Sequence, residues 1–103
     1  MSNFILRKQP NEIVPCSIDF KLRIPTGETI SAGTSTVTVT DSGGTDKTTD
    51  MTVGSFAISG TVLSVVLKAG TNLLNYTVTF KAVTTPAAYK FEDEVLLEIR
   101  ETP

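Results

Sequence analysis

The sequence contains no histidine and no tryptophan, and it has a single cysteine, Cys16. Without histidine the commonest general base and metal-binding side chain is missing, and Cys16 has no partner for an internal disulfide. It is expected to be a small buried residue in a chain made in a reducing compartment. The sequence also has no G-x-x-x-x-G-K phosphate loop, no G-x-S-x-G motif and no C-x-x-C pair. We therefore expect no catalytic residues and no cofactor.

The chain also lacks an excess of either charge and any long apolar run. Nine basic and eleven acidic residues leave a net charge of −2, without the basic surplus of nucleic-acid-binding domains. The apolar run 4–6 near the start is shorter than the roughly 7–15 residues of a signal peptide, and no segment reaches the roughly 20 of a membrane span. We expect a protein made in the cytoplasm without a signal peptide, with neither nucleic acid nor membrane as a partner.

What the chain does have is a strong strand signal. Seventeen of its 103 residues are threonine, whose branched β-carbon suits strands and disfavours helices. Apolar and polar residues alternate with the two-residue period of a half-buried strand, and glycine and proline turns separate the runs. The alternating runs are 18–24, 34–40 and 76–82, and a fourth run, 61–68, is apolar on both faces.

These runs predict a single all-β domain over residues 1–103, in keeping with the usual size of a domain. Residues 12–16 and 50–53 are expected to form short edge strands, since Pro15 is tolerated only at an edge. The polar residues 41–50 are expected to form a mobile loop.

The C-terminal segment 87–101 is ambiguous. Phe91, Val95 and Ile99 are spaced by four, as on a helix, yet Val95, Leu97 and Ile99 also alternate as on a strand. We expect a strand, because a lone helix would leave the sandwich without its last strand.

Tyr76 is the most informative single residue, because it opens a strand shortly after a turn at 70–72. In immunoglobulin-like folds a tyrosine near the start of the sixth strand bonds its hydroxyl back to the preceding corner. Two residues later antibody domains have a cysteine, and Val78 stands there as expected of a disulfide-free sandwich. The alternative is an ordinary core tyrosine, which is equally structural. The fold predicted from these features is an immunoglobulin-like antiparallel β-sandwich of about seven strands.

Two acidic clusters are candidate metal sites: Asp41, Asp46 and Asp50 in one loop, and residues 92–94 before the last strand. Calcium requires six to eight oxygen ligands converging from a constrained loop, and the first cluster lacks the D-x-D-x-D-G spacing that would impose this. We interpret both clusters as solvated acidic segments and expect no metal site, with calcium binding as the alternative.

Three large apolar residues, Phe4, Ile5 and Leu6, lie at the N-terminus, where a free end is usually polar. One interpretation is that they form the first strand of the domain's own sheet. The other is that residues 1–7 are an arm that adds to the sheet or surface of a neighbour, which would make Phe4, Ile5 and Leu6 interface residues.

Several short motifs follow one another over residues 6–101. They are K-Q-P-N-E-I-V-P, I-D-F, G-E-T-I, T-S-T-V-T-V-T, V-V-L-K-A-G-T, Y-T-V-T-F and E-D-E-V-L-L-E-I-R. In this order and spacing the chain resembles a family of small phage structural proteins, the fibre–tail or neck adaptors. It departs from the family pattern at Phe20, where the family tends to have tryptophan, and at residues 68–70, which replace a G-G turn.

The resemblance implies a β-sandwich building block of the virion, present in several copies and forming a homo-oligomer in the particle. It implies contacts with other virion proteins of the tail, neck, fibre or capsid, and no catalytic residue or cofactor. Phe20, Tyr76 and Val78 would then have structural roles. The alternative is a carbohydrate- or cell-surface-binding immunoglobulin-like module, although such modules usually present aromatic platforms and this chain has no tryptophan.

Overall fold

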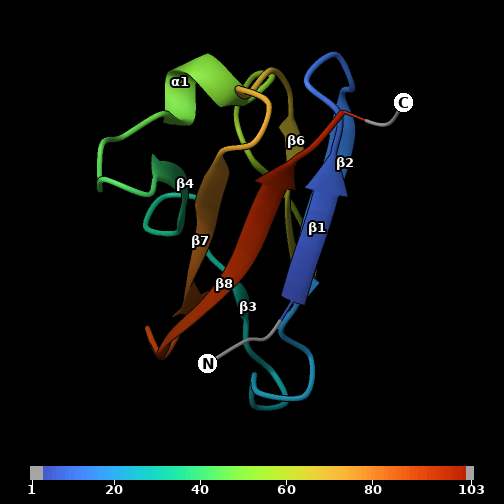
Figure 1. The fold of residues 1–103 in the computed structure, drawn as a ribbon. Coiled ribbons are helices and arrows are strands. Elements are labelled where there is room, and N and C mark those ends of the chain that lie inside the picture. Colours follow the sequence, from blue (N-terminus) through green and yellow to red (C-terminus); the bar gives the residue numbers. More distant parts are fainter. Residues whose placement is uncertain (1–3, 102–103) are drawn as a thin grey trace.

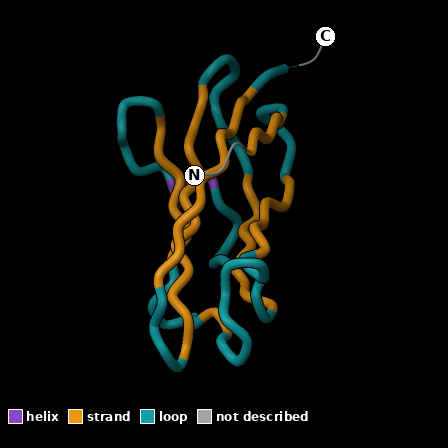
Figure 2. Tube along the Cα trace, turned by 90° about the horizontal axis from the view of Figure 1, so that it is seen from below, coloured by secondary structure: helices purple, strands orange, loops and turns teal. Residues whose placement is uncertain are grey.

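The structure is a computed structural model that describes residues 4–101, without the side chain of Phe4. Strands dominate this range and only one short helical segment occurs in it (Figure 2). The elements are β1 (Phe4–Lys8), β2 (Val14–Asp19), β3 (Thr29–Ile30), β4 (Thr36–Asp41), α1 (Thr48–Met51), β5 (Ala57–Ser59), β6 (Val62–Leu67), β7 (Asn75–Thr85) and β8 (Lys90–Ile99).

The strands form two sheets (Figure 1). One has the order β1-β8-β7, and β4 and β3 both pair with β7 at successive positions along its other edge. The second has the order β2-β6-β5. The predicted all-β sandwich is confirmed, with eight strands in the described range where about seven were expected.

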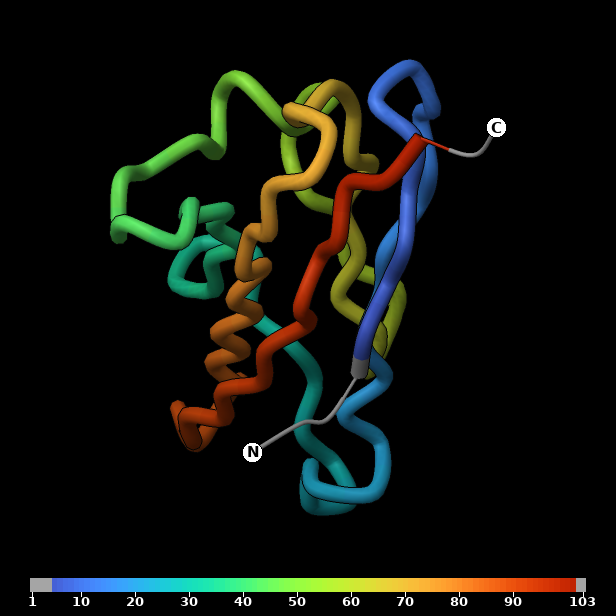
Figure 3. Tube along the Cα trace, in the orientation of Figure 1, coloured from blue at the N-terminus to red at the C-terminus, as the bar shows by residue number. Residues whose placement is uncertain are grey.

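The pairing of β1 with β8 is parallel, whereas the other pairings of the described strands are antiparallel, as predicted. Leu6 lies opposite Leu97, and Lys8 lies opposite Ile99. Figure 3 shows this N-terminal strand running beside the C-terminal strand. The pairing joins opposite ends of the sequence, and no local pattern reveals such a contact.

The core lies between the sheets and is filled by alternate residues of each strand. On β7, Val78 and Phe80 are fully buried. Thr77 and Thr79, which alternate with them, lie on the outer side and are only partly buried. This is the alternation expected of a half-buried strand. The buried apolar residues are Cys16, Ile18, Phe20, Ile24, Ile30, Val37, Val39, Met51, Leu63, Val65, Leu67, Tyr76, Val78, Phe80, Ala82, Val95, Leu97 and Ile99.

The expectation of a strand through residue 24 was wrong beyond Asp19. The backbone N–H groups of Arg23 and Ile24 both donate to the carbonyl oxygen of Phe20, at 2.8 and 2.9 Å, so the chain turns there. The turn returns Ile24 to the core but leaves Leu22 at 98% exposed. The turn that follows Phe20 therefore has the same spacing of apolar residues that a continued strand would have.

The predicted edge strand at 50–53 is confirmed only in part. Asp50 and Met51 end α1, whereas Thr52 forms an antiparallel bridge with Leu67 and the backbone N–H of Val53 donates to the carbonyl oxygen of Val66 at 2.9 Å. The helix is fixed by side-chain contacts: the Thr48 hydroxyl donates to Asp46 at 2.6 Å and accepts the backbone N–H of Val39 at 2.9 Å. Residues 41–50, expected to be a mobile loop, thus include most of a helical turn docked on β4.

The strands expected within 34–40, 61–68 and 76–82 are confirmed as β4, β6 and β7, and residues 90–99 form β8 and not a helix. The edge strand expected at 12–16 is confirmed for residues 14–16, which belong to β2, and among the described strands β2 pairs with β6 alone. In the described residues no helix has the length and apolar character that a membrane span requires.

Candidate docking surfaces

Tyr76 lies at the start of β7 and links this strand to the turn before it. Its side chain is buried, and its hydroxyl oxygen accepts a hydrogen bond from the backbone N–H of Thr71 at 3.2 Å. Val78 is fully buried and lies opposite Val95 and Val39 on the neighbouring strands. This is the geometry of a tyrosine that fixes a corner. Both residues are inaccessible to a partner, and their contribution to stability stays a prediction.

Phe20 lies in the bend after β2 and is fully buried. The guanidinium carbon of Arg23 lies 4.6 Å from the centre of its ring, and Arg23 Nη2 donates to Asp93 Oδ2 at 2.9 Å. Since Asp93 belongs to β8, this ion pair ties the bend that follows one sheet to the other sheet. The surroundings of Phe20 are therefore those of a packing residue, and its predicted structural role remains to be measured.

Lys8 is a buried cation that local sequence patterns did not indicate. Lys8 is 2% exposed. Its Nζ donates to the carbonyl oxygens of Gln9 at 2.8 Å, Pro10 at 3.3 Å and Ala69. Burial lowers the pKa of Lys8, and the charge of Glu12 opposes this in part. The ammonium thus joins the end of β1 to the turn that follows β6.

Cys16 is buried on β2, as expected of a lone cysteine. Burial raises the pKa of its thiol to about 11. Such a thiol is protonated at neutral pH and is a poor nucleophile.

The carboxylates of Asp41 and Asp46 accept hydrogen bonds from the backbone of their own loop, residues 41–50. Asp41 Oδ1 accepts the N–H groups of Gly43 and Thr45, each at 2.9 Å, and Asp46 Oδ1 accepts the N–H of Thr48 at 2.9 Å. The hydrogen bonds from the Thr48 hydroxyl and N–H lower the pKa of Asp46. These carboxylates therefore already have donors from the loop.

The second acidic cluster is divided between the two sides of β8. Asp93 points inward to Arg23, whereas Glu92 and Glu94 lie on the outer side. Within residues 4–101 no group of three or more metal-binding side chains lies close enough together to hold an ion.

The N-terminal residues Phe4, Ile5 and Leu6 belong to β1, which pairs with β8 of the same chain. This is the first of the two arrangements considered above. Leu6 packs against the core, Ile5 is 61% exposed, and the side chain of Phe4 lies outside what the structure describes. Because β1 is the edge of its sheet, the interface role of these residues stays a prediction.

The outer surface of the three-stranded sheet carries almost no charge. Asp19, at the end of β2, is the single charged residue in β2, β5 and β6. Across this surface Ser17, Ser64 and Ala57 form one row. Charged residues are depleted at the centre of protein interfaces, so this is a candidate docking surface that sequence alternation alone did not reveal. This uncharged face consists of Pro15, Ser17, Ala57, Ser59, Val62, Ser64 and Val66, and Asp19 borders it opposite Val62.

The outer surface of the other sheet is charged. Arg7 Nε donates to Glu98 Oε1 at 2.8 Å across β1 and β8. Threonines of β4 and β7 lie beside these charges, with Thr38 opposite Thr79. The charged residues of this charged face are Arg7, Lys81, Lys90, Glu92, Glu94 and Glu98.

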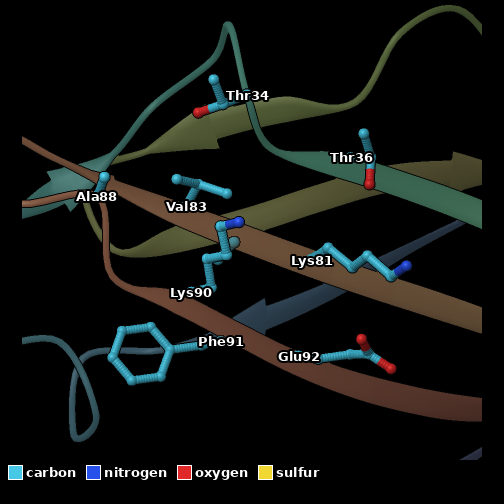
Figure 4. A pocket seen from close by; sticks show the side chains of 9 residues that line it. Thr34, Thr36, Lys81, Val83, Ala88, Lys90, Phe91 and Glu92 are labelled. Atoms are coloured by element: carbon cyan, nitrogen blue, oxygen red, sulfur yellow. The ribbon is translucent and has the colours of Figure 1, made fainter.

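One end of the charged face is hollowed by about 690 Å³ (Figure 4). Lys81 and Glu92 extend to the same side there, while the Phe91 ring points away from Lys81. A carbohydrate platform would require an exposed ring, and Tyr89, half exposed, is the one aromatic among the strongly exposed apolar residues in the described chain. No feature of this hollow favours a carbohydrate ligand.

Comparison with known families identifies the family of this chain. The family model Gp77, described as podophage GP4 fiber-tail adaptor protein gp77, matches residues 8–98. No curated protein and no solved structure matches the chain.

Proposed function

The chain belongs to the podophage GP4 fiber-tail adaptor family, and on this premise we propose that it is a structural component of a phage particle that joins fibres to the tail. The match over residues 8–98 carries the proposal, because it spans β2 to β7 completely and nearly all of β8. The protein acts through contacts with other virion proteins and catalyses no reaction.

We further propose that several copies are present in each particle. Tails are built with rotational symmetry, so an adaptor recurs at each equivalent position. Copies that touch do so head to tail and close into a ring when the rotation closes. The homo-oligomer then exists on the tail and need not form in solution.

An adaptor requires two contact surfaces, and the uncharged face supports one of them. Permanent interfaces are more apolar and contain fewer charged residues than the rest of a surface. On this face Val62 and Val66 lie among the small side chains of serines and alanine, and no residue of the face requires a charged partner group. We assign the uncharged face to the permanent contact with the tail.

The test uses phage in which this gene is disrupted and supplied from a plasmid. Ser64→Arg places a charge in the middle row of the uncharged face, and Thr79→Arg is the matched control on the central strand of the charged face. Both side chains are partly buried on outer surfaces, so both variants should fold, which urea melts check. The measured quantity is the amount of fibre protein per tail protein in purified particles.

We expect particles without the protein to have tails but few fibres. Ser64→Arg should give the same loss, and Thr79→Arg should restore the fibres. Full fibre content in particles that lack the protein would contradict the adaptor function. Normal fibres with Ser64→Arg would place the tail contact on another surface and leave the adaptor function standing.

A further inference from the structure

The free edge of β1 offers backbone groups to a partner. In the described part of the chain β1 pairs with β8 and with no other strand. The N–H of Arg100 donates to the carbonyl oxygen of Lys8 at 2.9 Å, so Lys8 is one of the β1 residues whose backbone faces β8. Backbone direction alternates along a strand. The N–H and C=O groups of Ile5 and Arg7 therefore face away from β8.

An apolar hollow of about 270 Å³ lies beside the first half of β1. It opens between β1 and β2, the two strands that run side by side in Figures 1 and 3. Ile5, Leu6 and Val95 line it from one sheet. Pro15, Cys16 and Ser17 of β2 line it from the other, so the hollow meets the margin of the uncharged face at Pro15 and Ser17. Because proline has no N–H, the β2 edge is poorly suited to a further strand. The β1 edge has no such obstacle.

A second hollow, of about 210 Å³, lies beside the other half of β1 and is basic. Its lining has three cationic residues and one carboxylate. Lys8 Nζ and the Arg100 guanidinium already donate to oxygens of the protein, so Arg7 is the cation that can meet an acidic partner group. Arg7 bonds to Glu98 through Nε, which leaves its terminal nitrogens available to an incoming carboxylate. The lining residues are Arg7, Lys8, Gln9, Glu12 and Arg100.

We propose that β1 takes an extended segment of another virion protein as an additional strand, with an apolar side chain in the apolar hollow and an acidic one in the basic hollow. An extended main chain is the partner that satisfies the outward N–H and C=O groups of Ile5 and Arg7. The two hollows adjoin β1 residues two positions apart. Since side chains two apart in a strand lie on one face, the segment carries the pattern apolar-x-acidic, or the reverse.

This inference rests on the proposed adaptor function, because it names the second contact surface of the adaptor. It also gives Ile5 and Leu6 an interface role without detaching them from their own sheet. The segment belongs to the fibre, since the uncharged face is assigned to the tail.

The first test screens overlapping short peptides that cover the fibre and tail proteins of the same phage, and then measures affinity for the best peptide by fluorescence anisotropy. Ile5→Pro removes an outward N–H, whereas Ile5→Thr keeps it and removes only apolar contact. We expect a fibre peptide with the apolar-x-acidic pattern. Ile5→Pro should weaken its binding by about tenfold or more, and Ile5→Thr by less. Arg7→Glu should also weaken it, and more at low salt than at high salt.

The second test needs no variant and follows backbone hydrogen exchange by NMR. In the free protein the amides of Ile5 and Arg7 should exchange quickly and those of Leu6 and Lys8 slowly, because only the latter two face β8. Bound peptide should slow the exchange of Ile5 and Arg7. A tail peptide in place of a fibre peptide, no binding peptide, or a bound peptide that leaves both amides fast would overturn the proposal. So would normal fibre content in Ile5→Pro particles, even if particles lacking the protein lose their fibres and the adaptor function holds.

Discussion

Gly70 is the position where a single added methyl group should destabilise the fold most. Its φ is +100°, in the region that L side chains rarely adopt. A Cβ built there would lie 2.7 Å from Ile99 Cδ1, 2.8 Å from Ile99 Cγ1 and 3.2 Å from Met51 Cε. Ile99 is fully buried, so any shift of its side chain requires the surrounding core to repack.

The expected loss combines two effects. A positive φ at a residue with a Cβ costs roughly 1–2 kcal/mol, and overpacking a filled core costs roughly 1–3 kcal/mol. Gly70→Ala should therefore lower the free energy of unfolding by about 2–5 kcal/mol, a large part of the roughly 5–15 kcal/mol that a domain of this kind has.

Two other glycines separate these effects. Gly60 has φ +61° and no atom within 4 Å of the added Cβ, so Gly60→Ala should show only the backbone loss of about 1–2 kcal/mol. Gly33 has neither a positive φ nor a neighbour within 4 Å, and Gly33→Ala should be neutral or slightly stabilising. Urea melts of the three variants give the measurement. A Gly70→Ala variant no less stable than Gly60→Ala would refute the close packing against Ile99.

Three further predictions concern buried polar groups. Tyr76→Phe should lower the free energy of unfolding by about 1 kcal/mol through loss of the hydrogen bond from Thr71, and a urea melt that matches the parent would leave only a packing role. Lys8→Met should cost roughly 1–3 kcal/mol, because it removes the donor for carbonyl oxygens of Gln9 and Ala69. Since the pKa of Lys8 is lowered on folding, the unfolded chain binds more protons between the folded pKa and the unfolded value of 10.5. The parent should therefore gain stability relative to Lys8→Met as pH rises through that alkaline window, and a difference independent of pH would contradict the burial of the ammonium. Cys16, with a pKa of about 11 against the usual 9.0, should react with iodoacetamide at pH 8 about a hundredfold more slowly in the folded protein than in urea; equal rates would show that the thiol is accessible.

The alternation of apolar and polar residues predicted strands correctly where one strand carries the whole alternating run. It failed where a turn places apolar residues at the same spacing. Residues 76–82 and 95–99 alternate along a single strand, and both form strands. Residues 18–24 alternate as well, but the turn after Phe20 returns Ile24 to the core by another route. Within 18–24 the spacing therefore distinguished neither a turn from a strand nor the exposed Leu22 from its buried neighbours.

Features that depend on distant segments could not be predicted from the sequence. The parallel pairing of β1 with β8 joins the two ends of the chain, and Lys8 is satisfied by a carbonyl group 61 residues away. The uncharged face was hidden for the same reason, because Ser17, Ser64 and Ala57 become neighbours only when β2, β6 and β5 pair. The family resemblance supplied the functional class, but not which surface makes contact.

A cryo-EM reconstruction of the phage tail, at a resolution that separates strands, tests most directly whether this chain stands between fibre and tail. We expect density for the sandwich of residues 4–101 at every fibre attachment site, with the uncharged face against the tail and an additional strand of the fibre protein along β1. Fibres that attach to the tail with no such density between them, or a sandwich located elsewhere on the particle, would contradict the account.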